Sequence, residues 1–188
     1  MAVRYPDSRK EETHARIVAS ASELLREAGV NGIGVADLMR SVGLTHGGFY
    51  AHFDSKEALV GESVSTALGQ TIAHLRAAAE EAPKNGARQA IAATYLNARH
   101  RDHPERGCAA AALGADVSRL APATRAAFEG RLEEMLAMLA EYSGARGEAA
   151  RDKAIVMFST MVGAMVLARA VRSKALSEEI LEVAREAV

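Results

Sequence analysis

The sequence predicts an all-α protein of about nine helices, with an N-terminal three-helix domain and a larger C-terminal helical domain. Three observations predict this fold class. Apolar residues recur at helical spacing along most of the 188-residue chain, no strand-like alternation persists, and there are only four prolines. The apolar fraction of 49% suffices for a buried core, which must consist mainly of aliphatic residues, alanine and methionine because aromatics make up 4% and tryptophan is absent.

The elements follow from periodicity and from the residues that interrupt helices. The first helix is expected over about 9–28, and Gly29 ends it in the usual position after the last turn. A short helix over 35–42 and a second over about 45–52 follow, separated by Gly43. The remaining helices are expected at about 55–79, 87–100, 108–119, 123–142, 148–173 and 177–187.

Two of these helices have candidate capping residues. Thr45 is expected to accept a hydrogen bond from a backbone N–H two or three residues further on. Asp54 or Ser55 is expected to cap the long helix, and Asp54 with Glu57 would complete a capping-box pair. The three-helix domain is therefore expected to cover residues 1–54, and the helical domain residues 55–188.

Charge and cysteine count narrow the function classes. The net charge is −1 and no block of the chain is strongly basic, so contacts to a nucleic acid must come from local placement of charge. The single cysteine excludes an intrachain disulfide and is typical of a cytoplasmic protein. The N-terminus, MAVRYPDSRKEE, is polar and lacks the apolar segment of a secretory signal.

Two short helices joined at a glycine, after a longer first helix, form a helix-turn-helix pattern. The second helix of this motif enters the DNA major groove and reads base edges from its N-terminal end. In the stretch GLTHGGFYAHF, Gly47 and Gly48 each cost about 1 kcal/mol relative to alanine in a helix interior. We therefore expect them to let the backbone lie against DNA, while Phe49 and Phe53 anchor the helix to the core.

The run from about 16 to 59 resembles the DNA-binding domain of the TetR family of bacterial transcriptional regulators. The matching stretch is AGVNGIGVADLMRSVGLTHGGFYAHFDSKEAL. The resemblance and the glycine argument together give the expected DNA-binding residues, which are Thr45, His46, Gly47, Gly48, Tyr50, His52 and Lys56. Tyr50, His52 and Lys56 are expected to meet phosphate oxygens. One departure is Gly34, which stands where this family usually has a serine or threonine cap.

The resemblance implies a homodimeric regulator, a repressor that binds palindromic operator DNA and leaves it when an effector favours another conformer. Two other classes stay open: a helical interaction module without DNA binding, and a metal-carboxylate helical bundle. The bundle needs Glu-x-x-His motifs on two facing helices, and the sequence lacks such a pair. No catalytic or nucleotide-binding motif is present, so we expect no enzyme activity, no cofactor and no metal site.

The stretch AIVMFSTMVGAMVLARAV, residues 154–171, is apolar nearly all round. Its length touches the lower limit of a membrane span, but an arginine lies inside it and small residues lower its hydrophobicity. We expect no membrane insertion, but a helix buried on one side by its own core and on the other by a second subunit. The residues expected at this dimer interface are Phe158, Val162, Met165 and Arg169.

Cys108 opens a helix in the segment DHPERGCAAAALGADVSR. The helix N-terminus and neighbouring Arg106 favour a reactive thiolate, and Gly107 is expected to leave the thiol accessible. The segment resembles a TetR-family subgroup similar to the electrophile-responsive repressor of N-ethylmaleimide reductase, in which a Gly-Cys pair begins the corresponding helix. Two interpretations stay open for Cys108, an oxidant or electrophile sensor and a small buried core residue.

Two further groups of residues have open interpretations. Five methionines either line an apolar effector pocket or fill the core: Met135, Met138, Met157, Met161 and Met165. Four polar residues in one loop could hold a metal, but we expect them to be solvated: His100, Asp102, His103 and Glu105. The effector expected from this reasoning is a small apolar or electrophilic molecule.

Overall fold

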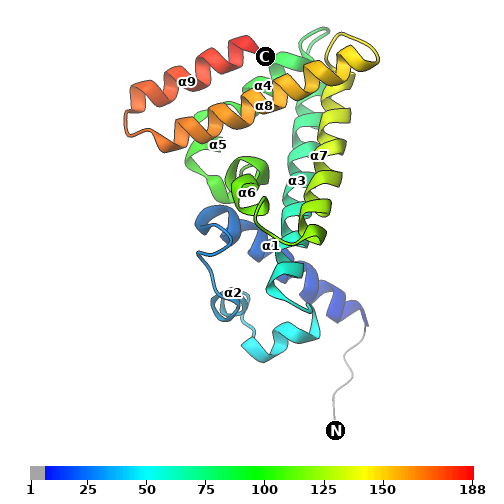
Figure 1. The fold of residues 1–188 in the computed structure, drawn as a ribbon, viewed down its shortest axis with the longest axis vertical. Helices are drawn as coiled ribbons and strands as arrows, with labels where there is room; N and C mark the ends of the chain where they lie inside the picture. Colours follow the sequence, from blue (N-terminus) through cyan, green and yellow to red (C-terminus); the bar gives the residue numbers. More distant parts are fainter. Residues whose placement is uncertain (1–6) are drawn as a thin grey trace.

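The computed structural model describes residues 7–188, and every regular element within that range is helical (Figure 1). The elements are α1 (Asp7–Ala28), α2 (Val35–Ser41), η1 (His46–Ala51), α3 (Lys56–Glu80), α4 (Ala87–Tyr95), α5 (Ala98–Asp102), η2 (Pro104–Arg106), α6 (Ala109–Val117), α7 (Pro122–Glu141), α8 (Glu148–Ala170) and α9 (Lys174–Ala187). The expected all-α fold is confirmed. Residues 1–6, the start of the polar stretch for which we expect no secretory signal, lie outside the described residues.

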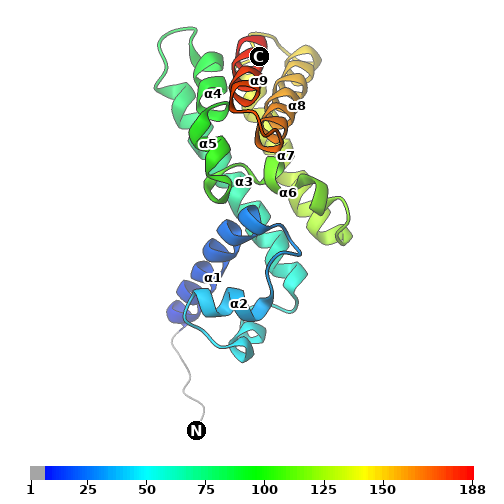
Figure 2. The ribbon, with the colours of Figure 1, turned by 90° about the vertical axis from the view of Figure 1, so that its left-hand side faces the viewer.

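The helices form two connected units (Figures 1 and 2). In the first, α1 packs on α3 and on α2, and α2 packs on η1. In the second, α7 packs on α3 and on α8, and α8 packs on α9. Because the long helix α3 runs from the first unit into the second, it belongs to both. The short helix α6 lies at the junction, in contact with α1, α3 and α8.

The start of α3 is fixed to the start of α7. Ser55 caps α3, because its side chain accepts a hydrogen bond from the Ala58 N–H at 3.0 Å, which confirms one of the two expected caps. The side chain of Glu57 accepts a hydrogen bond from the Ala121 N–H at the start of α7, so no capping box forms with it. The Thr124 hydroxyl also donates to the Glu57 carbonyl at 3.4 Å.

The prediction of a single helix over 87–100 is wrong, because the structure has two helices there, α4 and α5. Asn97 is the cause. Its side-chain oxygen accepts from the His100 N–H at 2.9 Å, while its amide donates to the Thr94 carbonyl at 2.8 Å. These local bonds compete with the helical ladder, so one side chain ends α4 and caps α5. The division directs the chain through η2 toward Cys108.

The second short helix is the six-residue 3₁₀-helix η1, and its expected side-chain cap is wrong. Thr45 occupies the N-cap position with extended backbone but makes no side-chain capping bond there. Two adjacent glycines lower the propensity for a regular α-helix, and a short segment gains little from cooperativity. The aromatic anchors are confirmed, since Phe49 and Phe53 are both buried.

Helix α8 has two apolar faces, and the expected dimer interface lies on the inner one. Phe158 and Met165 are buried in the core of this subunit, Val162 is half-buried, and Arg169 donates inward to backbone carbonyls. The interface prediction is therefore corrected for Phe158 and Met165. The sequence shows that α8 is apolar all round but not which face meets its own core. The large apolar side chains on the exposed face are Ile155, Val156, Val166 and Leu167.

By length and composition, α8 is also the one helix within residues 7–188 that is long and apolar enough to cross a membrane. Of its most apolar window, 39% is buried inside the subunit. The helix packs on α6, α7 and α9. A core helix of a soluble protein passes the same test, so this finding gives weak support to a membrane span.

Two glycine-to-alanine substitutions are expected to change stability in opposite directions. Gly43 has a φ of +74°, which separates α2 from η1, so Gly43→Ala should lower the free energy of unfolding by about 1–2 kcal/mol. Gly130 lies on the exposed side of α7 with open space around it, so Gly130→Ala should raise that free energy by about 0.5–1 kcal/mol. Urea denaturation at equal protein concentration measures both; equal effects of the two substitutions would contradict this account.

Candidate functional site

The exposed side of η1 is the candidate DNA-binding surface. Thr45, His46 and Gly47 are exposed at its start, and Tyr50 is 65% exposed although its neighbour Phe49 is buried. The rings of His46 and Tyr50 meet edge to face, with centroids 5.9 Å apart. His46 places a ring nitrogen at the N-terminal end of the second helix-turn-helix element, and Tyr50 presents its hydroxyl from the last turn of the same exposed side.

The two glycines of η1 are not required by the fold. A Cβ atom at Gly47 would have nothing within 4 Å. A Cβ atom at Gly48 would lie 3.8 Å from the Met39 Cε and from the Thr45 Oγ1, which is ordinary van der Waals contact. Neither residue has a positive φ. The reason for two adjacent glycines is therefore absent from this subunit's own packing, which leaves close approach by a partner as the physical explanation.

Lys56 has a different position from the one expected. Its ammonium donates to the carbonyls of Val30, at 2.7 Å, and Ile33, at 2.6 Å. Two of its three N–H donors therefore hold the loop between α1 and α2. The expected phosphate contact is corrected to a structural one, because this ammonium is directed at the loop that positions α2.

His52 is half-buried beside two other rings. Its centroid lies 6.0 Å from that of His14 and 6.4 Å from that of Phe53, and its Nδ1 is buried without a hydrogen-bond partner. Burial lowers the pKa of His52, and the charges of His14 and Lys10 lower it further. The imidazole therefore stays neutral at pH 7, so a phosphate contact by His52 would be a hydrogen bond without a full charge.

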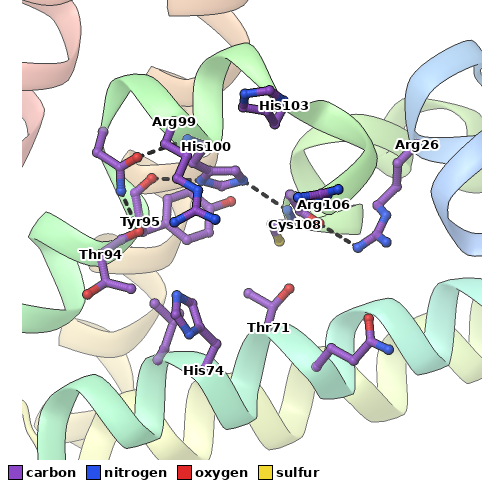
Figure 3. Close-up of a pocket in the computed structure, with 14 residues that line it drawn as sticks. Arg26, Thr71, His74, Thr94, Tyr95, Arg99, His100, His103, Arg106 and Cys108 are labelled. Atoms are coloured by element: carbon purple, nitrogen blue, oxygen red, sulfur yellow. Dashed lines mark hydrogen bonds between the residues drawn. The ribbon is translucent and has the colours of Figure 1, made fainter. Parts of the chain in front are cut away.

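The second candidate site is a cavity of about 650 Å³ between α1, α3, α4, α5 and the segment that ends at Cys108 (Figure 3). Figure 3 shows side chains of α3 facing those of α4 and α5 across it. Its lining residues are Arg26, Gln70, Thr71, His74, Leu75, Thr94, Tyr95, Asn97, Arg99, His100, His103, Arg106, Gly107 and Cys108. Cavities of this volume typically hold small molecules.

Cys108 is the N-cap residue of α6, so it lies at the start of a helix as expected. The expectation that its thiol is accessible is wrong. Only 1% of the residue is exposed. Its backbone N–H donates to the His100 Nε2 at 2.9 Å, and the segment is covered by α1 through the bond from Arg26 to the Gly107 carbonyl. A reagent can therefore reach the thiol only through the cavity or after local opening.

His100 is held on both ring nitrogens, so its expected place in a solvated loop is wrong. Its Nδ1 lies 2.7 Å from the Tyr95 carbonyl, and its Nε2 faces the Cys108 N–H. This network assigns the proton to Nδ1, which donates to Tyr95. Burial lowers the pKa of His100 to about 4, and the nearby positive charges of Arg169 and Arg26 act in the same direction. His103, by contrast, is exposed as expected.

Arg26 joins the cavity to the helix-turn-helix unit. It lies in the last turn of α1, is 7% exposed, and donates to the Ser22 carbonyl at 3.0 Å and to the Gly107 carbonyl at 2.7 Å. A second link joins α6 to the end of α1, because the Asp116 carboxylate accepts from the Val30 N–H at 3.2 Å. Any movement of the cavity wall near Gly107 therefore acts directly on α1.

Arg169 supports the same wall from α8. Its guanidinium donates to the carbonyls of His100, at 2.6 Å, and Arg101, at 3.2 Å. Burial lowers the pKa of Arg169. The prediction from sequence treated this arginine as an obstacle to membrane insertion and as a dimer-interface residue, although a charged residue inside an apolar helix also indicates a buried polar network.

Several residues of this cavity escaped sequence reasoning, among them Arg26 and Tyr95. Arg26 follows Leu25 on the buried side of α1, where an arginine is unusual. This position was the sequence signal that could have indicated a buried polar site. Tyr95 had no signal, since a buried tyrosine in a helix reads as core. Of the two interpretations of the five methionines, the structure supports the core, because all five are buried and none lines this cavity. Within residues 9–188, no cluster of three metal-ligating side chains occurs.

The buried His100 should make stability depend on pH. An unfolded histidine binds a proton below pH 6.5, whereas folded His100 does so only below about pH 4. The unfolded state therefore holds the extra proton in that window, and the free energy of unfolding should fall on going from pH 7 to pH 4.5, by on the order of 2–3 kcal/mol for this group. In His100→Gln the decline should be shallower by that amount.

The control is His46→Gln, which removes an exposed histidine that forms no ion pair with a carboxylate of residues 9–188 and should leave the pH dependence as in the wild type. Urea denaturation at several pH values measures the difference. Identical pH dependence in wild type and His100→Gln would show that His100 titrates normally in the folded protein.

Comparisons with known proteins agree with this geometry. The sequence profile of the family described as "Bacterial regulatory proteins, tetR family" matches residues 17–62, which include α1 from its second half, α2, η1 and the start of α3. A search of the curated proteins finds no significant match. The solved structure of E. coli NemR in its reduced form is 23% identical, with a TM-score of 0.79 and 94% of each chain covered.

Two further solved structures are similar over nearly the whole chain. A TetR-family transcriptional regulator from Agrobacterium tumefaciens is 21% identical, with a TM-score of 0.78, and covers 95% of this chain and 98% of its own. One from Cytophaga hutchinsonii is 19% identical, with a TM-score of 0.80, and covers 95% of this chain and 94% of its own. Residues 17–62 therefore match the DNA-binding domain of the TetR family of bacterial regulatory proteins, and the chain as a whole has the fold of solved TetR-family regulators.

Proposed function

We propose that this chain is a homodimeric repressor that binds palindromic operator DNA through η1 and leaves it when its cavity is occupied or its cysteine is modified. The observation that carries the proposal is the position of Arg26, which belongs to the first helix of the DNA-binding domain and also lines the cavity. One residue thus takes part in both sites.

The proposed DNA contacts come from the exposed side of η1. His46 is at the N-terminal end, where base edges are read, and the Tyr50 hydroxyl is free to donate to a phosphate oxygen. At Gly47 and Gly48 the backbone itself approaches the DNA. Thr45, exposed and without a capping bond, has its hydroxyl available for a phosphate. These contacts would position η1 on the DNA, and they do not require a strongly basic protein surface.

The proposed dimer forms through the outer faces of α8 and α9. Val156, 65% exposed, and Leu167, 56% exposed, lie on the outer face of α8, with the exposed Gly163 between them allowing close approach. On α9, Leu176 and Val183 are exposed as well. A run of large exposed apolar residues on two neighbouring helices indicates a protein interface. Two subunits present two copies of η1, which is what a palindromic site requires.

Release from DNA follows from two-state coupling. An effector that binds more tightly to a conformer with a displaced Gly107 segment shifts the population toward that conformer. The bond from Arg26 to the Gly107 carbonyl transmits the displacement to α1, which packs on α2 and α3. The same conformer then holds η1 at a position or spacing that no longer fits the operator.

A thiol-reactive effector is a second route to that conformer. Cys108 lines the cavity, and the fold resembles that of NemR, whose solved structure is described as the reduced form. An adduct on the Cys108 sulfur would occupy the cavity beside Tyr95 and Gly107, where it acts as a tethered ligand. Because the residue is buried, this route requires a reagent small enough to enter the cavity.

Gly47→Ala should separate DNA binding from stability. The Cβ has open space in the free protein, so unfolding should be unchanged within about 0.5 kcal/mol, whereas the methyl group meets the DNA surface in the complex. Affinity for DNA selected by the wild type from a random pool should fall at least tenfold, about 1.4 kcal/mol, in fluorescence anisotropy at about 150 mM salt.

Gly130→Ala, far along the chain on α7, is the control and should bind as the wild type does. Failure of the wild type to select any sequence would favour the alternative of a helical interaction module without DNA binding. Wild-type affinity in Gly47→Ala would show that η1 does not approach DNA at its glycines.

Leu167→Glu should produce a folded monomer. The substitution places a carboxylate in each half of the proposed interface, where it loses water and faces its own copy. Light scattering should give the mass of one chain for Leu167→Glu and of two chains for the wild type. Ala126→Glu, on the exposed side of α7, should remain a dimer; a dimeric Leu167→Glu would place the interface elsewhere.

A further inference from the structure

The cavity has a lining rich in cations and free of carboxylates. Of the fourteen lining residues, none is aspartate or glutamate, whereas three are arginines, Arg26, Arg99 and Arg106, and three are histidines. The whole chain carries 24 acidic residues against 23 lysines and arginines. An acid-free lining therefore departs from the average composition of this chain, and it makes the cavity a region of positive potential.

Arg26 is the innermost of these cations. Both of its hydrogen bonds go to backbone carbonyls, and no carboxylate of residues 9–188 forms an ion pair with it. Burial lowers the pKa of Arg26, and the charges of Glu23, Cys108 and Glu105 only partly offset that effect. A buried guanidinium without a counter-ion is costly, and an anion in the cavity would reduce that cost.

The carboxylate nearest to the cavity rim already has partners. Glu105 accepts from the His103 Nδ1 at 3.2 Å, and its oxygen lies 3.9 Å from the Arg106 Nε. The Arg106 side chain is nevertheless 73% exposed, and Arg99 is exposed as well. The long, flexible side chains of Arg99 and Arg106 at the rim, together with the buried Arg26 on the wall, form the usual environment for a carboxylate or phosphate group.

Tyr95 supplies a second, independent indication of a missing acceptor. It is 1% exposed and lines the cavity (Figure 3), and its buried hydroxyl has no nitrogen or oxygen partner, since its neighbour is the Cys108 thiol, a weak acceptor. Burial raises the pKa of Tyr95 well above its ordinary value, so the hydroxyl keeps its proton and is a donor. A buried donor with no strong acceptor destabilises the folded state. A ligand oxygen would satisfy it.

The uncharged polar residues of the cavity lining can form hydrogen bonds with the other polar groups of such a ligand. Gln70 and Thr71 of α3 and Thr94 of α4 provide neutral donors and acceptors around the cavity. His100 does not take part, because both of its ring nitrogens are bound to backbone groups. Leu75, the ring of Tyr95 and the hydrocarbon parts of the polar side chains form the apolar part of the lining, which suits the organic body of a charged ligand. A purely apolar effector would leave most of these polar groups without partners.

We propose that the cavity binds a small organic anion, a carboxylate or a phosphate ester, whose charged group meets Arg99, Arg106 and the Tyr95 hydroxyl. This inference rests on the proposed function in one respect: the anion is the effector that releases DNA. It replaces the expected apolar effector by an anionic one, and the volume of about 650 Å³ limits the ligand to a small molecule.

The test is calorimetric titration of the full-length dimer with three probes of similar shape: benzoate, phenyl phosphate and the neutral benzamide. The buffer contains chloride at constant ionic strength and no other oxyanion. We expect saturable binding of benzoate or phenyl phosphate, with at least tenfold weaker binding of benzamide. The preferred anion then distinguishes a carboxylate site from a phosphate site.

Three variants connect binding to the named residues. The double variant Arg99→Gln and Arg106→Gln should weaken the preferred anion at least tenfold, and Tyr95→Phe should weaken it severalfold. Arg125→Gln removes an exposed arginine outside the cavity and should leave the affinity unchanged. Thermal denaturation without ligand identifies any variant that fails to fold. Because Arg99 and Arg106 are exposed, the double variant is expected to fold normally.

Two results would overturn the anion site: benzamide binding as tightly as the anions, or no saturable binding of either anion. An equal loss in Arg125→Gln and in the double variant would do the same, because it would show non-specific attraction. Operator titration in parallel keeps the two proposals apart. Loss of anion binding with intact DNA binding rejects the cavity proposal alone, whereas failure to bind DNA rejects the proposed function alone.

Discussion

The structure depends on one buried guanidinium. Arg26, near the end of α1, donates to the Gly107 carbonyl at 2.7 Å and thereby fixes the segment that leads into α6. Without that bond the Gly107 carbonyl would be buried without a partner, and the buried guanidinium would keep only its bond to the Ser22 carbonyl. The constraint explains why the cavity wall and the DNA-binding unit have a defined relation although few other side chains join them.

The same constraint explains the chemistry around Cys108. The Gly107 carbonyl is held by Arg26 and the Cys108 N–H is held by His100, so both polar atoms of the peptide group between Gly107 and Cys108 are fixed. His100 is in turn fixed by the Tyr95 carbonyl. A ligand or adduct in the cavity must therefore disturb a connected set of hydrogen bonds, and α1 is part of that set. A connected set of this kind is what the proposed coupling between the cavity and the DNA-binding unit requires.

Sequence reasoning recovered the parts of the fold that local signals determine. Gly29 and Gly43 have the positive φ expected of residues that end helices, and Ser55 caps α3. The division at Asn97 was missed because a single asparagine inside a periodic helix carries no decisive signal. The faces of α8 were assigned the wrong way round, since an all-round apolar pattern does not show which side meets the core.

For the functional sites, too, local sequence signals were more informative than contacts between distant parts of the chain. The exposed residues of η1 were found because helix-turn-helix geometry is local to a short stretch. Lys56 was misplaced because its partners, the Val30 and Ile33 carbonyls, lie more than twenty residues away. An effector pocket was expected, but most of its lining and its charge were not predicted, because it is assembled from helices that are distant in sequence, and its cations come from α1, α5 and η2.

The most direct test of the coupling through Arg26 uses the single cysteine as a probe. The rate at which a small thiol reagent modifies Cys108 is measured with the free protein, with operator DNA and with unrelated DNA of equal length. By reciprocity, operator binding must stabilise the closed Gly107 segment. The account predicts a slower reaction with operator DNA in the wild type and no such effect in Arg26→Gln. An equal rate with operator and with unrelated DNA in the wild type would contradict it.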